Sequence, residues 1–244
     1  MNVLILAGGK GTRFREETVI KPKPMIEING VPMLLHIINH YNHYGHKKFT
    51  VLGGFKIDYI HDYFSNLFTR IETNTYKYNN SEVTILDTGL DTMTGGRVKQ
   101  AIEFFDDEEE FMLTYGDGIS NVNLKNLYKF YKDKNFLSVV TAVRPPARFG
   151  RLRIKNETVI EFGEKNQADE GWINGGFFVL KPDVIELISG DTTAFENGPL
   201  AKLASMNQMK AFRHSGFWQP MDTLRDKNSL NELWETKKAP WKVW

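Results

Sequence analysis

The chain has 244 residues, of which 41% are hydrophobic and 25% are charged, so it can bury the core of an ordinary globular domain. A net charge of +1 excludes a strong overall field for nucleic acid or membranes, and the lack of cysteine excludes disulfides, thiolate catalysis and cysteine-ligated metal. The N-terminal apolar run lacks a cationic leader, and no apolar stretch approaches ~18 residues. We therefore expect a cytoplasmic protein with neither a nucleic-acid nor a membrane partner.

Short apolar runs alternate with helical patterns through the first half of the chain. The patterns predict four strands, near residues 2–7, 49–53, 83–87 and 111–115. They also predict three helices, near residues 33–45, 57–66 and 96–105. This order is typical of βαβ units on a parallel sheet, in which ligands bind beyond the carboxyl ends of the strands.

The second half is richer in β-like runs. We expect strands near 137–144, 150–155, 158–162 and 174–180, and helices near 182–189, 198–206 and 222–235. These strands should extend the first sheet and carry an acceptor substrate. No linker or repeat separates the halves, so we expect one α/β domain over 1–244, with halves at about 1–134 and 135–244. The predicted architecture is a Rossmann-like mixed, mainly parallel sheet flanked by helices, with a small C-terminal extension.

A glycine-rich, cationic loop follows the first predicted strand. Leu6 and Ala7 end the apolar run, Gly8-Gly9-Lys10-Gly11-Thr12-Arg13 comes next, and Lys21-Pro22-Lys23-Pro24 follows soon after. Glycines let backbone N–H groups approach an anion, and the basic side chains add charge. The spacing matches neither a Walker A loop nor a dinucleotide fingerprint. The loop therefore predicts a phosphate site of another class, the alternative being a plain glycine-rich turn.

A carboxylate follows the fourth predicted strand. Asp117 lies in Tyr115-Gly116-Asp117-Gly118, where the glycines leave room for a bulky ligand beside the carboxylate. Because both this residue and the glycine-rich loop follow strands of one predicted sheet, they should meet at the same edge. Such a carboxylate suits a divalent cation such as Mg²⁺, which takes one or two protein carboxylates together with phosphates and water.

The sequence resembles the sugar-1-phosphate nucleotidyltransferases, whose signature is Gly-Gly-x-Gly-Thr-Arg followed by Pro-Lys-Pro. Four more stretches are similar to the cytidylyltransferases of that family: Met93–Arg97, Thr114–Gly118, Asn174–Phe178 and Gly216–Asp226. The resemblance runs from Met1 to the final Lys-Ala-Pro-Trp-Lys segment. It implies Mg²⁺, a homo-oligomer (a hexamer), and transfer of a cytidylyl group from CTP to α-D-glucose 1-phosphate, as in deoxysugar and surface-polysaccharide synthesis. Another nucleotide or sugar 1-phosphate, or a non-catalytic nucleotide-binding subunit, remains the alternative.

The resemblance also implies residue roles. Arg13, Lys23 and Asp117 would be catalytic, and Asp117 and Asp222 would hold the metal, although Asp222 opens a predicted helix and could instead be its cap. The nucleotide would be bound by Leu6, Ala7, Gly8, Gly9, Gly11, Thr12, Arg13, Lys23, Thr94, Gly95, Gly96 and Arg97. The sugar phosphate would be bound by Tyr115, Gly150, Glu164, Lys165, Asn174, Gly175 and Gly176. Apart from the resemblance, Glu164-Lys165 reads as a solvent-facing charge pair, and Asn174-Gly175-Gly176 as a β-bulge.

Arg97 carries an argument about the base. A guanidinium only donates hydrogen bonds, and cytosine presents two adjacent acceptors, O2 and N3, where uracil and thymine have an N3–H donor. Arg97 therefore favours cytosine, because the wrong pyrimidine would leave two buried donors facing each other. A grip on a phosphate or a surface ion pair is the alternative.

Histidines and tryptophans offer weaker signals. His36, His40 and His43 share helical spacing, and we expect a solvated helix face there rather than a zinc site. Trp234, Trp241 and Trp244 suit either an oligomer interface or packing within the chain.

Overall fold

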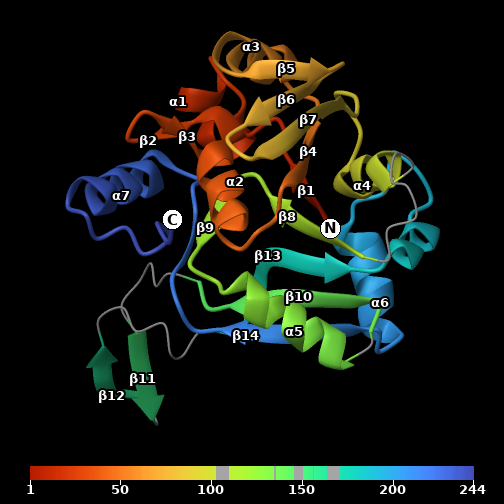
Figure 1. Ribbon diagram of the computed structural model, residues 1–244. Coiled ribbons are helices and arrows are strands. Elements are labelled where there is room, and N and C mark those ends of the chain that lie inside the picture. The colour runs from red at the N-terminus through yellow and green to blue at the C-terminus, as the bar shows by residue number, and fades with distance from the viewer. Residues whose placement is uncertain (103–109, 135, 146–150, 156, 164–170) are drawn as a thin grey trace.

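A nine-stranded mixed sheet forms the centre of the structure, a computed structural model that describes all residues except 103–109, 135, 146–150, 156 and 164–170 (Figure 1). In spatial order, its strands are β14 (Met209–His214), β10 (Ser138–Val143), β13 (Ile173–Leu180), β8 (Phe111–Tyr115), β1 (Asn2–Leu6), β4 (Lys48–Gly53), β7 (Ser81–Asp87), β6 (Thr75–Tyr78) and β5 (Thr69–Glu72).

Strand directions place several strand ends at one edge of the sheet. β1 lies parallel to β4 and β8, β4 lies parallel to β7, and β10 lies parallel to β14. β13 runs antiparallel to its neighbours β8 and β10, so its first residues lie at the edge where those strands end. The expected mainly parallel mixed sheet is confirmed, and its carboxyl edge is where the two predicted sites meet.

Helices cover both faces of the sheet. Val3 and Ile5 of β1 belong to one buried core, with α2 (Met33–His43), α3 (Ile57–Leu67), α5 (Leu124–Lys134) and α7 (Leu224–Glu235). Leu4 and Leu6 belong to the other core, with α4 (Thr94–Ile102), η4 (Pro182–Leu187) and α6 (Ala201–Ser205). Because β1 is buried on both faces, its sequence reads as one continuous apolar run.

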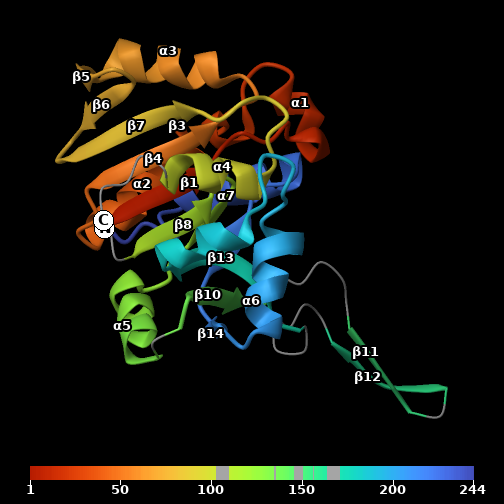
Figure 2. The same ribbon diagram turned by 90° about the vertical axis from the view of Figure 1, so that its right-hand side faces the viewer.

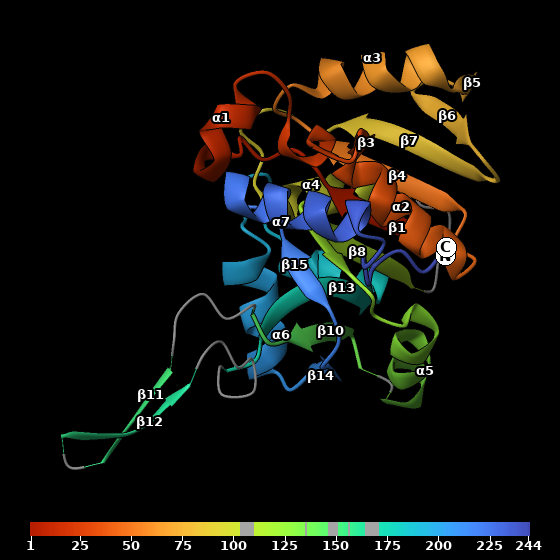
Figure 3. The same cartoon turned by 90° about the vertical axis from the view of Figure 1, so that its left-hand side faces the viewer.

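Several second-half predictions need correction. β11 (Arg151–Lys155) and β12 (Thr158–Gly163) do not extend the sheet but pair only with each other. Their ribbon projects from the body of the molecule in two views from opposite sides (Figures 2 and 3). Helix α5 was not predicted, and the helix expected near 198–206 divides into the π-helical turn η5 (Glu196–Leu200) and α6.

The expectation of a solvated histidine face on α2 is wrong for two of its three members. His36 is 1% exposed and His40 is 3% exposed. The Nε2 of His36 lies 3.2 Å from the carbonyl of Ile28, and the indole Nε1 of Trp241 donates to His36 Nδ1 at 3.4 Å. Trp241, 1% exposed, therefore packs within the chain. Among the described residues there is no group of three or more metal-ligating side chains, and no helix could cross a membrane.

Burial of His36 predicts a loss of stability in mild acid. Burial lowers its pKa from 6.5 to about 4, so the unfolded chain takes up the proton first as the pH falls. The contribution of neutral His36 to the free energy of unfolding should therefore be complete above pH 6.5 and decrease as the pH falls towards 4. From pH 7 to pH 5 this one histidine should account for about 2 kcal/mol. Urea titrations at both pH values test this, and His36→Gln should shrink the pH-dependent loss by that amount.

Candidate active site

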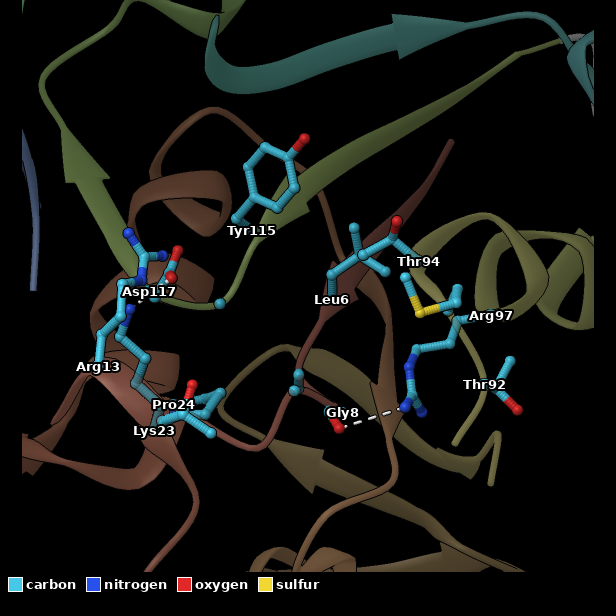
Figure 4. A pocket seen from close by; sticks show the side chains of 16 residues that line it. Leu6, Gly8, Arg13, Lys23, Pro24, Thr92, Thr94, Arg97, Tyr115 and Asp117 are labelled. Carbon is cyan, nitrogen blue, oxygen red and sulfur yellow. Dashed lines mark hydrogen bonds and ion pairs between the residues drawn. The ribbon is translucent and has the colours of Figure 1, made fainter. Parts of the chain in front are cut away.

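A cavity of about 340 Å³ lies at the carboxyl ends of β1 and β8. Ten of the twelve predicted nucleotide-binding residues line it: Leu6, Ala7, Gly8, Gly9, Gly11, Thr12, Arg13, Lys23, Thr94 and Arg97. Tyr115 and Asp117 line it as well. Arg13, Lys23 and Asp117 gather at one end of the cavity, Thr94 and Arg97 lie at the other, and Leu6 and Gly8 lie between (Figure 4). The remaining two, Gly95 and Gly96, lie against Thr193 and Asp191, where a Cβ would come within 2.6 Å and 2.5 Å of the neighbouring atoms.

The glycine-rich loop needs glycine at two positions for different reasons. Gly11 has a φ of 61°, in the left-handed region that side chains disfavour, and it leads into the 3₁₀ turn η1 (Thr12–Phe14). At Gly8 a Cβ would lie 2.2 Å from Cζ of Arg97, so the loop backbone and that guanidinium are in direct contact. The loop is therefore shaped both by its own backbone and by a side chain from α4.

Four charged side chains from separate segments meet at the end of the cavity near β8. The ammonium of Lys23 lies 2.6 Å from Oδ2 of Asp117 and 2.5 Å from Oδ1 of Asp222. The guanidinium of Arg13 reaches the other oxygen of Asp222 at 3.1 Å. The structure thus brings together the residues that the sequence proposed for phosphate and for metal. Lys21, the other lysine of the Lys-Pro-Lys-Pro segment, pairs instead with Glu27 at 2.7 Å.

Asp222 is not the cap of helix α7. The N-cap is Thr223, whose hydroxyl accepts from the backbone N–H of Asp226 at 3.2 Å. The carboxylate of Asp226 in turn accepts from the backbone N–H groups of Asp222 and Thr223. This capping box satisfies the start of the helix without the Asp222 side chain. The carboxylate of Asp222 therefore takes no part in the cap and instead pairs with Lys23 and Arg13.

Arg97 is held by the backbone of neighbouring loops. Its Nη1 donates to the carbonyl of Gly53 at 2.6 Å and to Oγ1 of Thr88 at 2.5 Å, and its Nη2 donates to the carbonyl of Gly8 at 3.2 Å. It is 4% exposed, and burial lowers its pKa against the opposing influence of Asp87 and Asp191. The surface ion pair is therefore not what is observed. Arg97 ties the end of β4 to the loops after β1 and β7, and its recognition of a base stays a prediction.

The Thr88 hydroxyl orients Arg97, so removing it should weaken nucleotide binding. Thr88 is 2% exposed, and its Oγ1 both donates to Gly53 and accepts from Arg97. Thr88→Val keeps the shape but leaves one guanidinium N–H unpaired, which costs about 1–3 kcal/mol. We expect the Kd for CTP to rise roughly tenfold in calorimetric titrations. Thr88→Ser should bind like the unsubstituted protein, and equal affinity in the valine variant would contradict this role.

A hydrogen-bonded chain links the sugar-side residues to the start of α4. Asn174 donates through Nδ2 to the Tyr115 hydroxyl at 3.1 Å, and that hydroxyl donates to Oε1 of Glu196 at 2.9 Å. The second oxygen of Glu196 accepts from Thr94 Oγ1 at 2.7 Å. Burial, with Glu196 nearby, raises the pKa of Tyr115, so the phenol stays protonated and donates. Sequence reasoning missed Glu196, because it belongs to no motif and its partners are 81 and 102 residues away.

The Asn174-Gly175-Gly176 segment forms a β-bulge, which the sequence analysis gave as the alternative to sugar binding. The register between β10 and β13 shifts between Val140 and Ala142, and Gly176 has a φ of 77°. A Cβ on Gly175 would lie 2.6 Å from a methyl group of Val143. The bulge places Asn174 beside Tyr115. The other predicted sugar-phosphate residues, Gly150, Glu164 and Lys165, lie outside the described residues, so their roles stay predictions.

Comparisons with known proteins show the family of this chain. Residues 2–223, which include all four members of the charged cluster, match the nucleotidyl transferase family. The chain belongs to that family. This nucleotidyl transferase is 46% identical to the glucose-1-phosphate cytidylyltransferase of Salmonella typhimurium over 256 aligned residues, covering all of both chains. It is 39% identical to the probable glucose-1-phosphate cytidylyltransferase of Bacillus subtilis, again over the full length of both.

Solved structures agree on the fold of this nucleotidyl transferase. HddC from Yersinia pseudotuberculosis aligns with a TM-score of 0.73 at 26% identity, over 96% of this chain and 99% of that one. A UDP-glucose pyrophosphorylase complexed with UDP-glucose aligns with a TM-score of 0.70 at 19% identity, over 97% and 98% of the two chains. The second likeness concerns the fold alone.

Proposed function

We propose that the protein transfers the cytidylyl group of CTP to α-D-glucose 1-phosphate, releasing pyrophosphate and forming CDP-glucose. The observation that carries the proposal is the joining of Arg13, Lys23, Asp117 and Asp222 at one end of a cavity lined by a glycine-rich loop. Two relatives named for this activity, one as probable, support it over the full chain.

The chemistry that this site must supply is positioning and charge neutralisation. The phosphate of a sugar 1-phosphate is already ionised near neutral pH, so no general base is needed to attack the α-phosphorus of the nucleotide. The loop backbone would cradle the triphosphate. Lys23 and Arg13 would pair with its oxygens and stabilise the charge that develops on the departing pyrophosphate. These roles account for a site built from glycine and charged side chains.

Mg²⁺ is the proposed cofactor, and Asp117 and Asp222 would hold it. The residues fit the ion because the two carboxylates already converge on a single cationic atom, the Nζ of Lys23. Mg²⁺ is commonly bound by one or two protein carboxylates together with substrate phosphates and water. When bound, it would neutralise phosphate charge and orient the triphosphate. No third carboxylate or histidine joins the pair within the part of the chain described, which leaves the remaining ligand positions to substrate and water.

The end of the cavity near Arg97 would receive the base, and the group of residues around Tyr115 would receive the sugar. Arg97 has five N–H groups and makes three hydrogen bonds to described residues, which leaves donor capacity for the O2 and N3 of cytosine. Tyr115, Asn174 and Glu196 offer a phenol, an amide and a carboxylate for sugar hydroxyls, and Lys165 and Glu164 would complete that subsite. We further propose that the enzyme works in the cytoplasm as a homo-oligomer.

A substrate panel tests the specificity. Pyrophosphate release should be measured with Mg²⁺ across CTP, UTP, dTTP, ATP and GTP, each paired with glucose 1-phosphate and other sugar 1-phosphates. We expect release with CTP and glucose 1-phosphate. Release with a different pair would keep the reaction and overturn the specificity, and silence with every pair would favour a nucleotide-binding subunit.

A further inference from the structure

The charged cluster is neutralised from within the protein. Asp222 pairs through one oxygen with Lys23 and through the other with Arg13, and Asp117 shares the same lysine. Two cations therefore face two carboxylates with no ligand present. Under the proposed function, on which this inference rests, the cations belong to the phosphates and the carboxylates to the metal. Every one of these groups is thus paired with a partner that it must give up before catalysis.

Lys23 is the most enclosed member of the cluster. Its side chain is 9% exposed, against 15% for Asp222, 33% for Asp117 and 74% for Arg13. Removing the counter-charges of a buried ammonium is strongly unfavourable, because water cannot replace them. A divalent cation that binds the two carboxylates alone would strand Lys23 in this way. A nucleotide that binds Lys23 alone would leave two carboxylates facing its phosphates.

We propose that Lys23 has a second role: it is the resident counter-ion of Asp117 and Asp222, and it is exchanged for the divalent cation when nucleotide binds. The nucleotide phosphates pair with Lys23 and Arg13 as the cation binds the two carboxylates, so no charged group is left without a partner. The cation and the nucleotide therefore strengthen each other's binding by the same factor, about 10- to 100-fold.

Mn²⁺ binding without nucleotide tests the exchange directly. The free ion is measured by electron paramagnetic resonance for the unsubstituted protein and for Lys23→Met, Lys23→Arg and Lys21→Met. Lys23→Met removes the resident ammonium and should bind Mn²⁺ about 10- to 100-fold more tightly than the unsubstituted protein. Lys23→Arg keeps the charge and should bind Mn²⁺ as weakly as the unsubstituted protein. Lys21→Met is the matched control, because Lys21 pairs with Glu27 outside the cluster.

The outcomes separate this proposal from the proposed function. Equal Mn²⁺ affinity in Lys23→Met and the unsubstituted protein would overturn the exchange while leaving the metal ligands in place. Equal Mn²⁺ affinity in Lys23→Met and in the double variant Lys23→Met with Asp117→Asn, both without nucleotide, would instead remove the metal assignment itself. If Lys23→Met does not fold, Lys23→Gln takes its place: it also removes the ammonium and should bind Mn²⁺ more tightly than the unsubstituted protein, and equal affinity would overturn the proposal.

Discussion

Asp117→Asn is expected to lower the rate of pyrophosphate release from CTP and glucose 1-phosphate by about 10³-fold or more. The neutral amide cannot supply the charged oxygen that now meets Lys23 at 2.6 Å and that would bind Mg²⁺. It has nearly the same size, and Asp222 still pairs with Lys23, so the protein should fold. The measurement is steady-state pyrophosphate release at saturating substrates, with circular dichroism to confirm folding.

Two companion variants sharpen that result. Asp222→Asn should cause a loss of similar size, because it removes the other carboxylate that faces Lys23. Asp62→Asn, on the exposed surface of α3, is the matched control and should leave the rate unchanged. A rate within threefold of the unsubstituted protein in Asp117→Asn would rule out its role at the metal.

Lys23→Met is expected to reduce kcat by about 10²–10³-fold, or ~3–4 kcal/mol of transition-state stabilisation. Methionine preserves much of the side-chain volume but carries no charge for the departing pyrophosphate. The loss should appear mainly in kcat, because the charge on the pyrophosphate grows in the transition state. Stopped-time assays at saturating CTP give this value.

Lys21→Met again provides the control, and it should retain nearly full activity because Lys21 is occupied by Glu27. If Lys21→Met proved the more damaging of the two, the phosphate contact would belong to the other lysine of the Lys-Pro-Lys-Pro segment. Equal rates in Lys23→Met and the unsubstituted protein would remove Lys23 from the reaction.

The sequence allowed most of the sheet to be predicted, because its central strands carry strong local signals. β1 reads as a strand since four consecutive residues, Val3 to Leu6, are buried against two different cores. β11 and β12 were also recognised as strands. That they pair with each other, and not with the main sheet, was not predicted, because the alternation of side chains indicates a strand but does not indicate which sheet it joins.

Helix α5 was missed although its signals are present. Leu124, Leu127 and Tyr131 are buried at helical spacing, and the side chain of Asn123 accepts from the N–H of Asn126 at the start of the helix. The helix sequence is Leu-Lys-Asn-Leu-Tyr-Lys-Phe-Tyr-Lys-Asp-Lys, and the lysines and tyrosines between its buried residues obscured the apolar period. A search for caps would have found it.

Some features of the candidate site follow from local sequence patterns, and others depend on contacts between segments that are distant in the sequence. The glycine-rich loop and Asp117 were predicted to meet because both follow parallel strands, and the cavity joins them. Lys23 was named on the resemblance, and it differs from Lys21 in the structure because it begins the 3₁₀ turn η2 (Lys23–Met25) and faces Asp117, whereas Lys21 pairs with Glu27. Glu196 and the backbone partners of Arg97 depend on contacts between distant segments, which no local pattern encodes.

The central claim is attack by the sugar-phosphate oxygen on the α-phosphorus of CTP, and oxygen labelling tests it most directly. Glucose 1-phosphate carrying ¹⁸O in its non-bridging phosphate oxygens is incubated with CTP, Mg²⁺ and the protein, and the products are followed by ³¹P NMR and mass spectrometry. The account predicts CDP-glucose with ¹⁸O in the bridge between its two phosphorus atoms and pyrophosphate free of label. Label in the pyrophosphate, or CTP consumed without CDP-glucose, would contradict it.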